Sequence, residues 1–480
     1  MKVLKGLIST LIGIGFLLPS FAFAGTLEIT AWIPYWRAER GVTDITPRLS
    51  SFTEVNPFLY TVTTDGRLHQ ADEITDQEWQ NLKQSAEEKG LRFVPTVMWA
   101  NADAMHEVLS DPVKRQAHVK SIASEVYRYG YDGIDIDYEA RYARTRDAYT
   151  QFHKELNVAI GYDKWIMCTL QSRTPLDSRY SSPESIPADI EYGNDFAELN
   201  KYCDRIRVMT YDQGRIDLKL NAENGHPYTP VSDVQWVRKV MNLIAEEVPK
   251  EKLLLGIPTY GYEYDTFPSA DGSGTAYSRL WSFNPGYATE IASKLNLTPV
   301  RDKGGELTLT FPASQSPEPI IPLPNATRLL VWSDAEAINQ KLALAEELGI
   351  AGASIFKIDD GQDPGIWSVL EKHTAVNQKK KPLDTSSTLA EVPSTVSTSL
   401  NLPKVDLEEG DTSEGVRMLQ KFLNSKGFTV SSSGGGAPGN ETPNFGPKTK
   451  DALARFQKAH GIFPAVGYYG PITRGVISSI

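Results

Sequence analysis

The sequence predicts an α/β protein: a large (β/α)8 TIM barrel with a small α+β insertion, followed by a small three-helix domain. Three observations predict this fold. Short β-rich runs alternate with helical patterns from Gly25 to about Val376, which is typical of parallel β/α units. Eight such runs fit within this length, the number that closes a barrel. The chain also has 480 residues, which favours one large and one small domain over a single domain.

The barrel elements follow from the spacing of apolar residues. The expected strands are Leu27–Trp32, Val55–Thr61, Arg92–Met98, Gly133–Ile136, Trp165–Leu170, Arg205–Met209, Leu253–Ile257 and Ala353–Ile358. The expected helices are Asp76–Lys89, Pro112–Tyr129, Ala148–Ile160, Ser232–Glu247 and Asp334–Leu348.

Two further regions do not belong to the repeated β/α pattern. Residues 264–328 are too many for a plain loop, and they contain the alternating run 307–311 and the helical stretch 287–295. We expect them to form the α+β insertion over one rim of the barrel mouth. Residues 402–480 form the second domain, with apolar residues on one face of two helices: Val416, Leu419, Leu423, Ala452, Leu453 and Phe456.

The first 24 residues are predicted to be a secretory signal peptide. Lys2 and Lys5 precede an apolar stretch, and residues 22–24 form a small-x-small cleavage site. A retained membrane anchor is the alternative, although the stretch is short for a span. We therefore expect a secreted or wall-associated protein, periplasmic if the cell has an outer membrane. Residues 377–401, rich in Lys, Ser, Thr and Pro, are expected to be a flexible linker.

The charge of the chain excludes one class of partner. The net charge is −11, and removal of a signal peptide carrying two lysines and no acid would give −13. Such an acidic protein is a poor nucleic-acid ligand, and it is not drawn electrostatically to an anionic cell wall. Attachment to a wall would therefore need a dedicated module. We expect a monomer that does not contact the membrane after signal cleavage.

The chain has only two cysteines, Cys168 and Cys203, and their spacing does not suggest a metal site. Both fall near neighbouring expected strands, so a disulfide could form after export. We favour two buried free thiols over that disulfide.

Three acids recur at alternate positions at the end of the fourth expected strand. Because strand side chains alternate between faces, Asp135, Asp137 and Glu139 share one face, and Ile134 and Ile136 share the other. The isoleucines suit packing against surrounding helices. The acids would then point into the barrel and rise towards its carboxyl-terminal mouth, where barrel enzymes carry out their chemistry.

Neighbouring carboxyl groups cannot all ionise cheaply, so at least one should keep its proton near neutral pH. A retained proton is what the general acid of a glycosidase needs, and the outermost residue, Glu139, is the best placed to deliver it. A structural ion-pair network is one alternative, and metal binding by clustered acids is another. The seven histidines are scattered, and none joins the row. We expect no metal and no cofactor.

Several motifs resemble one enzyme family. Residues 132–139 resemble the DGxDxDxE signature of glycoside hydrolase family 18, residues 209–212 its MxYD motif, and residues 255–261 its seventh-strand signature. Residues 107–112 and 353–358 are most similar to those of bacterial spore-cortex and cell-wall N-acetylglucosaminidases. Two features depart from the chitinase pattern: the third strand lacks an SxGG motif, and Phe356 stands where many members carry a Trp.

The resemblance implies a substrate-assisted mechanism, in which the 2-acetamido oxygen of the sugar attacks its own anomeric carbon. Glu139 would donate a proton and later activate water. Asp137 would hold the acetamido N–H, and Asp135 would share a hydrogen bond with Asp137. Tyr211 would donate a hydrogen bond to the acetamido carbonyl, and Asp212 would bind sugar hydroxyls.

Other residues near the mouth are weaker candidates. The remaining expected substrate-binding residues are Met209, Phe356, Trp99, Trp36 and Tyr260, with Tyr262 and Trp281 as further platform candidates and Asn101 and Gln213 as polar ones. Each aromatic side chain could equally pack in the core or at the rim. Asp132 and Gly133 are expected to have structural roles.

The second domain resembles the type 1 peptidoglycan-binding module. The matching segments are residues 415–420, 444–449, 454–457 and 469–473. A generic three-helix bundle with another ligand is the alternative. A wall module would raise the local enzyme concentration on peptidoglycan. The implied partner is therefore the peptidoglycan strand, cut at the β-1,4 bond after N-acetylglucosamine. Chitin is the alternative substrate, and a catalytically inactive glycan-binding barrel is a third hypothesis.

Overall fold

The computed structural model describes residues 27–161, 163–269, 274–318, 325–374, 403, 407–460, 462 and 467–478. The expected signal peptide and most of the expected linker lie outside the described residues. Within the described part of the chain, no helix combines the length and the apolar character that crossing a membrane requires.

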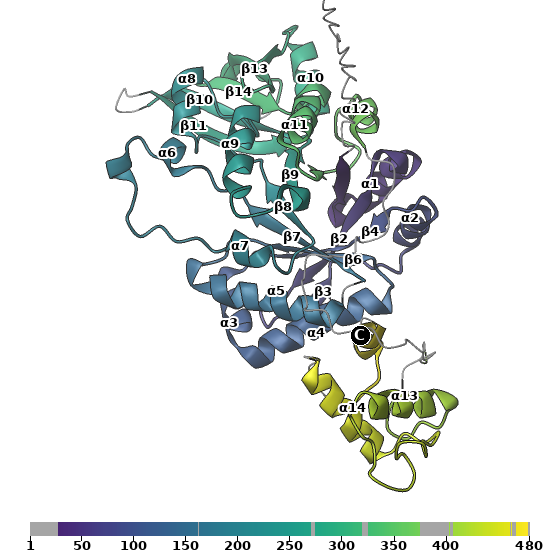
Figure 1. Cartoon of the computed structure of the whole chain (residues 1–480). Helices are drawn as coiled ribbons and strands as arrows, with labels where there is room; N and C mark the ends of the chain where they lie inside the picture. Colours follow the sequence, from purple (N-terminus) through teal and green to yellow (C-terminus); the bar gives the residue numbers. More distant parts are fainter. Residues whose placement is uncertain are drawn as a thin grey trace, which may run out of the picture.

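Eight parallel strands close into a barrel (Figure 1). They are β1 (Glu28–Ile33), β2 (Glu54–Val62), β5 (Thr96–Trp99), β6 (Gly133–Tyr138), β7 (Trp165–Gln171), β8 (Arg205–Met209), β9 (Leu253–Pro258) and β15 (Gly352–Phe356). The barrel is closed because β1 pairs with both β2 and β15. The predicted TIM-barrel class is confirmed.

The third expected strand is divided in two. β4 (Arg92–Phe93) and β5 are separated by Val94 and Pro95, and Pro95 has no N–H to donate to a neighbouring strand. A short strand, β3 (Leu68–Gln70), adds an antiparallel hairpin to β2.

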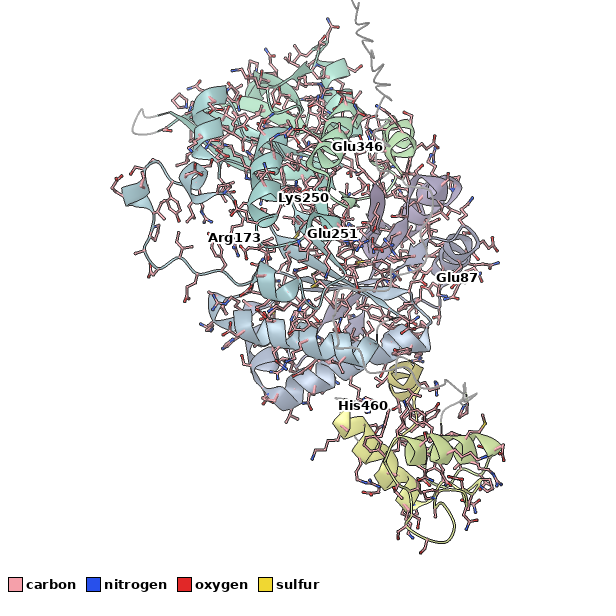
Figure 2. All side chains as sticks on the ribbon, in the orientation of Figure 1. Glu87, Arg173, Lys250, Glu251, Glu346 and His460 are labelled. Carbon is pink, nitrogen blue, oxygen red and sulfur yellow. A yellow bond between two sulfur atoms is a disulfide. The ribbon has the colours of Figure 1, made fainter. Side chains whose placement is uncertain are left out.

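Helices surround the barrel, and several of them begin at a side-chain cap. They are α1 (Ala38–Ile45), α2 (Gln77–Glu88), α3 (Ala102–Ser110), α4 (Pro112–Arg128), α5 (Arg146–Ile160), α6 (Leu176–Arg179), α7 (Phe196–Leu199), α8 (Leu218–Asn224), α9 (Val234–Ile244), α11 (Ala335–Leu348) and α12 (Ile366–His373). Asp111, for example, accepts hydrogen bonds from the first two amides it can reach in α4, those of Val113 and Lys114. Glu346 (Figure 2) joins α11 to α12 through Nδ1 of His373 at 2.8 Å.

The insertion is a second, antiparallel sheet covered by one helix. Its elements are β10 (Gly261–Pro268), β11 (Thr275–Phe283), α10 (Pro285–Lys294), β12 (Val300–Arg301), β13 (Leu307–Pro312) and β14 (Thr327–Trp332), in the sheet order β11-β10-β14-β13-β12. It starts three residues earlier and ends four residues later than the expected range 264–328, because β10 follows β9 after only Thr259 and Tyr260.

The two ends of the barrel have different surroundings. Lys250 and Glu251, labelled in Figure 2, directly precede β9 and mark the amino-terminal end of the strands. The insertion leaves from the opposite, carboxyl-terminal end, where β9 stops at Pro258. This is the end at which the acids of β6 were expected.

The second domain contains α13 (Glu414–Ser425), α14 (Pro447–Ala459) and α15 (Pro471–Ser478). All six apolar residues expected on the faces of its first two helices are buried. Each helix also holds the turn that follows it. Nε2 of Gln420 donates to the carbonyl of Asn444, and Nε2 of Gln457 donates to the carbonyl of Tyr468. Similar glutamine contacts therefore hold the turns that follow α13 and α14.

Cys168 and Cys203 form a disulfide, with their Cα atoms 5.9 Å apart. The expectation of two free thiols is therefore wrong. Cys168 lies within β7, and Cys203 lies two residues before β8, the parallel neighbour of β7. Pairing of the two strands brings the two cysteines together, a proximity that sequence spacing alone does not reveal.

Candidate active site

The strand β6 directs its acids into the barrel, as expected. Ile134 and Ile136 are completely buried among the surrounding helices. Asp135 and Asp137 are also buried, at 0% and 5% exposure, and Glu139 at the strand's end is half-buried. The alternation of strand side chains places the three acids in one row that rises to the barrel mouth.

Asp135 is the innermost acid and is surrounded by donors from four other strands. Its carboxylate accepts hydrogen bonds from Nε1 of Trp32 at 2.9 Å, Oγ1 of Thr96 at 2.8 Å and Oγ1 of Thr169 at 2.8 Å. Nη1 of Arg207 lies 3.0 Å from it. A carboxylate accepts hydrogen bonds through both oxygens, so these contacts fix the side chain of Asp135 between the strands.

Both oxygens of Asp135 accept hydrogen bonds from other strands, Oδ1 from Thr169 and Oδ2 from Trp32 and Thr96. The hydrogen bond expected between Asp135 and Asp137 stays a prediction. The row also has a cationic neighbour, Arg207, from β8. The alternation of β8 places Arg207 on the same face as Met209, which could have identified it from the sequence.

Arg207 belongs to a wider ion-pair network near the amino-terminal end of the barrel. It contacts Glu54, which also lies 2.7 Å from Nε of Arg92. Arg92 in turn lies 2.9 Å from Glu28. The structural ion-pair alternative therefore holds for Asp135, and the network ends there.

Asp137 and Glu139 differ from Asp135, because neither has an ion-pair partner among the described residues and burial raises the pKa of both. Burial raises the pKa of Asp137 well above its usual value, and the charges of Glu139 and Asp135 raise it further. Burial also raises the pKa of Glu139, with a further contribution from the charge of Asp212. Oδ1 of Asp137 is buried and has no hydrogen-bond partner among the described residues. The pair can therefore hold a proton and offer an acceptor to a ligand.

Arg141 is a cation near this pair that the sequence did not single out. Its guanidinium lowers the pKa of both Asp137 and Glu139. Nη2 donates to Oε1 of Gln171 at 2.8 Å, and the guanidinium stacks on the ring of Tyr149. These contacts hold the charge in place.

Tyr211 lies close to the acids and packs against Phe356. The two rings are stacked, with centroids 5.5 Å apart. Burial and the charges of Asp137 and Glu139 raise the pKa of Tyr211, so the phenol keeps the proton that it could donate. A Cβ at Gly256 would lie 2.7 Å from Cε1 of Tyr211, so the glycine of β9 makes room for this ring.

Asp212 is held by two tyrosines of the segment that leads into the insertion. Its Oδ1 accepts hydrogen bonds from the hydroxyls of Tyr260 at 2.5 Å and Tyr262 at 2.7 Å. Its backbone is left-handed, with φ 57°, and Ala140, next to Glu139, has φ 54°. Such conformations are uncommon for residues with a side chain and occur often at functional sites.

Three of the weaker candidates do not reach the mouth. Trp99 is only 2% exposed and packs against His118 and Tyr138, on the helix side of β5. The alternation of β5 places Met98, not Trp99, on the face of Thr96, and Met98 is half-buried. Gln213 is buried and accepts a hydrogen bond from the amide of Asp233, and Asn101 caps α3.

The remaining platform candidates differ in their surroundings. Trp36 is 50% exposed, packs edge-on against Tyr35 and also contacts Phe58, whose ring centroid lies 6.3 Å from that of Phe356. Trp281 pairs with Glu263 in the insertion sheet and packs against Tyr287 of α10, away from Asp212. Met209, at the end of β8, is half-buried beside the mouth.

Asp132 and Gly133 lie where structural roles require them. Oδ2 of Asp132 accepts a hydrogen bond from the amide of Phe93 at 2.9 Å and so ties β6 to β4. A Cβ at Gly133 would collide with the carbonyl oxygen of Trp165 on the neighbouring strand. Both residues support the start of β6 and do not reach its carboxyl end.

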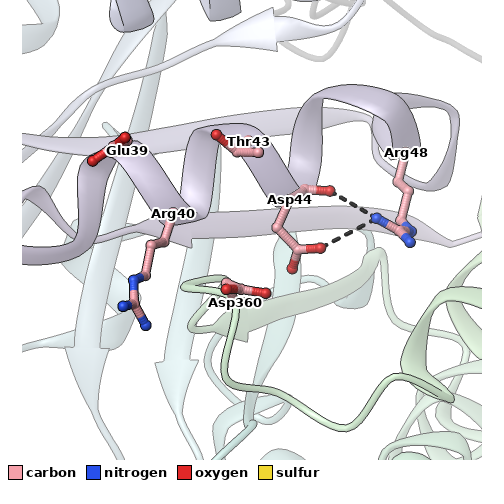
Figure 3. Close-up of a pocket in the computed structure, with 6 residues that line it drawn as sticks. All are labelled: Glu39, Arg40, Thr43, Asp44, Arg48 and Asp360. Atoms are coloured by element: carbon pink, nitrogen blue, oxygen red, sulfur yellow. Dashed lines mark hydrogen bonds and ion pairs between the residues drawn. The ribbon is translucent and has the colours of Figure 1, made fainter.

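Two other polar groupings lie outside the acidic row. His153 lies with Cys168 and Cys203 in a buried group of metal-ligand type, but the two sulfurs are bonded to each other. A hollow of about 590 Å³ beside α1 is shown in Figure 3. Its lining residues are Glu39, Arg40, Thr43, Asp44, Arg48 and Asp360. Arg48 and Asp44 pair at 3.2 Å, and no residue of the acidic row lines it.

Comparison with known families identifies both domains. Residues 30–361 match the model of glycosyl hydrolases family 18, and residues 412–477 match that of a peptidoglycan binding domain. The chain is 23% identical over 280 residues to the cortical fragment-lytic enzyme of Bacillus anthracis, covering 58% of each protein. It is 23% identical over 314 residues to chitinase A1 of Niallia circulans, covering 60% of this chain and 43% of that protein.

Solved structures show the same fold. The spore cortex-lytic enzyme SleL of Bacillus cereus has a TM-score of 0.58 at 20% identity, covering 74% of this chain and 76% of that chain. A class V chitinase from Pseudomonas fluorescens Pf-5 has a TM-score of 0.56 at 21% identity, covering 72% and 99%. The chain spans little more than half the length of the cortical fragment-lytic enzymes it matches.

Proposed function

The chain belongs to glycosyl hydrolases family 18, and we propose that it cleaves β-1,4 bonds after N-acetylglucosamine in peptidoglycan by a retaining, substrate-assisted mechanism. One observation carries this proposal: buried Asp137 and half-buried Glu139 form an acidic pair whose pKa values are both raised, at the carboxyl end of a barrel strand. A carboxyl group kept protonated at the mouth can protonate a leaving sugar oxygen.

In the first step, Glu139 transfers its proton to the glycosidic oxygen as the bond between that oxygen and the anomeric carbon breaks. The acetamido carbonyl oxygen of the same sugar forms the new bond to the anomeric carbon, which gives a cyclic oxazolinium ion. In the second step, Glu139 takes a proton from water, whose oxygen attacks the anomeric carbon from the face that the leaving group occupied. The bond between the anomeric carbon and the acetamido oxygen breaks at the same time, which restores the acetamido group. The configuration is retained, and the tethered nucleophile makes the attack unimolecular.

The neighbours of Glu139 orient the acetamido group in this mechanism. The unpartnered Oδ1 of Asp137 accepts the acetamido N–H, and the negative charge of Asp137 stabilises the positive ring. The protonated hydroxyl of Tyr211 donates to the acetamido carbonyl. Phe356, stacked on Tyr211, offers an apolar surface to the sugar, and Asp212 binds its hydroxyls.

Asp135 has a positioning role in this scheme. Its donors from β1, β5, β7 and β8 hold it rigidly, and its negative charge raises the pKa of Asp137. It therefore helps to retain the proton shared by the two outer acids without contacting the substrate.

The second domain favours peptidoglycan over chitin as the substrate. It matches a peptidoglycan binding family, and an anchor on the wall raises the enzyme's concentration near that polymer. The disulfide between Cys168 and Cys203 is consistent with an oxidising compartment and therefore with export. Chitin remains the second candidate, because relatives include chitinases and the chemistry would be the same.

The proposal is tested with purified full-length protein. We expect Glu139→Gln to fold normally and to lose nearly all turnover, because an amide cannot donate the proton. Purified sacculi and colloidal chitin are then digested side by side, and new reducing ends are identified by mass spectrometry. New N-acetylglucosamine ends from sacculi support the proposal. Products from chitin alone would defeat the peptidoglycan assignment, and substantial activity of Glu139→Gln would remove Glu139 from its role.

A further inference from the structure

The two faces of the insertion sheet differ in whether their charged side chains are paired. On the face towards α10, Arg328 is fully buried and is paired with both Glu263 and Asp265. On the other face, Tyr262 and Tyr264 approach Asp212 and the aromatic cluster that includes Tyr211. The second face therefore forms one wall of the barrel mouth, next to the acidic pair.

Two arginines lie on this wall. Arg279 of β11 pairs with Tyr264 across the sheet, and its guanidinium carbon lies 4.9 Å from the ring centroid of Tyr262. Arg215, three residues after Asp212, lies 4.7 Å from the ring centroid of Tyr277. Arg279 is thus connected through Tyr262 to Asp212, whose charge acts on Glu139.

Neither Arg279 nor Arg215 has an acidic partner within ion-pair distance among the residues that the structure describes. Arg279 is exposed, and the one hydrogen bond of Arg215 goes to the carbonyl of Thr275 at 3.1 Å. Two unpaired cations on one wall are unexpected in a chain with 60 acids and 49 bases. Two other cations, Lys357 and Arg37, both contact Asp359, and their charges are therefore compensated.

We propose that Arg279 and Arg215 bind a carboxylate of the glycan strand and so select an acidic polymer over neutral chitin. This inference rests on the proposed function, because it concerns the substrate of the same site. A guanidinium held over an aromatic ring keeps its N–H groups directed outward, and it binds carboxylates through paired hydrogen bonds. Chitin carries no carboxylate, whereas the muramic acid of peptidoglycan has a lactyl carboxyl group that is free or extended by a peptide.

The experiment compares three soluble substrates with the full-length protein. The first is glycan strands stripped of peptides, with free lactyl carboxylates. The second is the same strands with these carboxylates capped as methylamides, and the third is a neutral chitin oligosaccharide. For the wild-type protein we expect kcat/KM to fall about tenfold on capping, the scale of one charged hydrogen bond. We also expect rising salt to slow cleavage of the free-carboxylate strands only.

The variants separate charge recognition from a general effect on the site. Arg279→Ala and Arg215→Ala should each lower kcat/KM on the free-carboxylate strands through KM and leave the neutral oligosaccharide unchanged. Arg279→Lys should recover part of the loss. Arg128→Ala is the matched control, because Arg128 also stacks on a tyrosine, Tyr129, but at the carboxyl end of α4, away from the mouth.

Peptide-bearing strands identify the source of the carboxylate. If the arginine variants lose activity on these strands as well, the stem peptide supplies the carboxylate, and if they lose it only on stripped strands, the lactyl group does. Equal cleavage of free and capped strands by the wild-type protein would overturn the inference while leaving the proposed function intact. So would equal losses on the acidic and neutral substrates. Cleavage of chitin oligosaccharides without cleavage of any peptidoglycan strand would defeat both.

Discussion

Nη1 of Arg207 lies 3.0 Å from Oδ2 of Asp135, and both side chains are completely buried in the barrel. This pair divides the acidic row into two parts. Below it, Arg207 and Arg92 compensate Glu54 and Asp135. Above it, Asp137 and Glu139 have no ion-pair partner among the described residues, and their pKa values are raised. Activity should therefore depend on the outer pair, Asp137 and Glu139.

Asp212 and Arg141 should shift the pH profile in opposite directions. The negative charge of Asp212 raises the pKa of Glu139, and the positive charge of Arg141 lowers it. Because Glu139 must be protonated to act as the acid, its pKa sets the alkaline limb of kcat/KM. Asp212→Asn should move this limb to lower pH and Arg141→Gln to higher pH, as measured on a soluble oligosaccharide. Shifts in the same direction would contradict this assignment, whatever the change in maximal rate.

Glu139→Gln should be more stable than the wild-type protein at high pH. The folded-state pKa of Glu139 is raised above its unfolded value, so the wild-type protein loses stability as pH rises through the folded pKa. Glutamine does not ionise and avoids this loss. We expect the free energy of unfolding at pH 8 to be higher for the variant than for the wild-type protein, and the difference to narrow towards pH 4. Glu251→Gln, in the exposed turn before β9, serves as the control and should change little at either pH.

Gly256→Ala should displace the ring of Tyr211. The new Cβ would lie 2.7 Å from Cε1 of Tyr211 and 2.8 Å from the carbonyl oxygen of Val208, so the ring must move. A displacement of about 1 Å can lower turnover about a hundredfold. Gly286→Ala in α10 is the matched control, because no atom lies within 4 Å of its new Cβ. A folded Gly256→Ala protein with wild-type kcat would show that the position of Tyr211 is unimportant.

The disulfide should contribute strongly to stability. Cys168 and Cys203 are 35 residues apart, and closing a loop of this length restricts the unfolded chain by about 3 to 4 kcal/mol. The double variant Cys168→Ala/Cys203→Ala should therefore unfold at lower denaturant concentration, with activity on soluble substrates retained at low temperature. A loss below about 1 kcal/mol would mean that the unfolded chain is already restricted.

Removal of the second domain should affect insoluble and soluble substrates differently. A chain ending before residue 402 should bind sacculi at least about tenfold more weakly, because the local concentration provided by the module is lost. Its kcat/KM on a soluble oligosaccharide should not change, since the acidic row and its neighbours all lie in the barrel. Unchanged binding to sacculi would show that the module takes another ligand.

Periodicity alone predicted the barrel and the direction of its acids. Strand alternation placed Asp135, Asp137 and Glu139 on one face, and the structure shows the first two directed into the barrel. The same rule applied to β5 would have excluded Trp99, because Trp99 is one residue out of phase with Thr96. Trp99 was expected at the mouth because it is aromatic and ends its strand, although strand alternation places its side chain on the helix side.

The sequence by itself therefore determined the fold class, the order of the elements and the face of the acidic row, since these depend on local spacing along the strands. Tertiary structure alone decided which charges meet. Arg207 compensates Asp135 from another strand, Cys168 reaches Cys203 across a strand pair, and Arg279 stacks on Tyr262, which donates a hydrogen bond to Asp212. Such contacts join residues far apart in the chain, and their distances are set by strand pairing and packing, which no local pattern encodes.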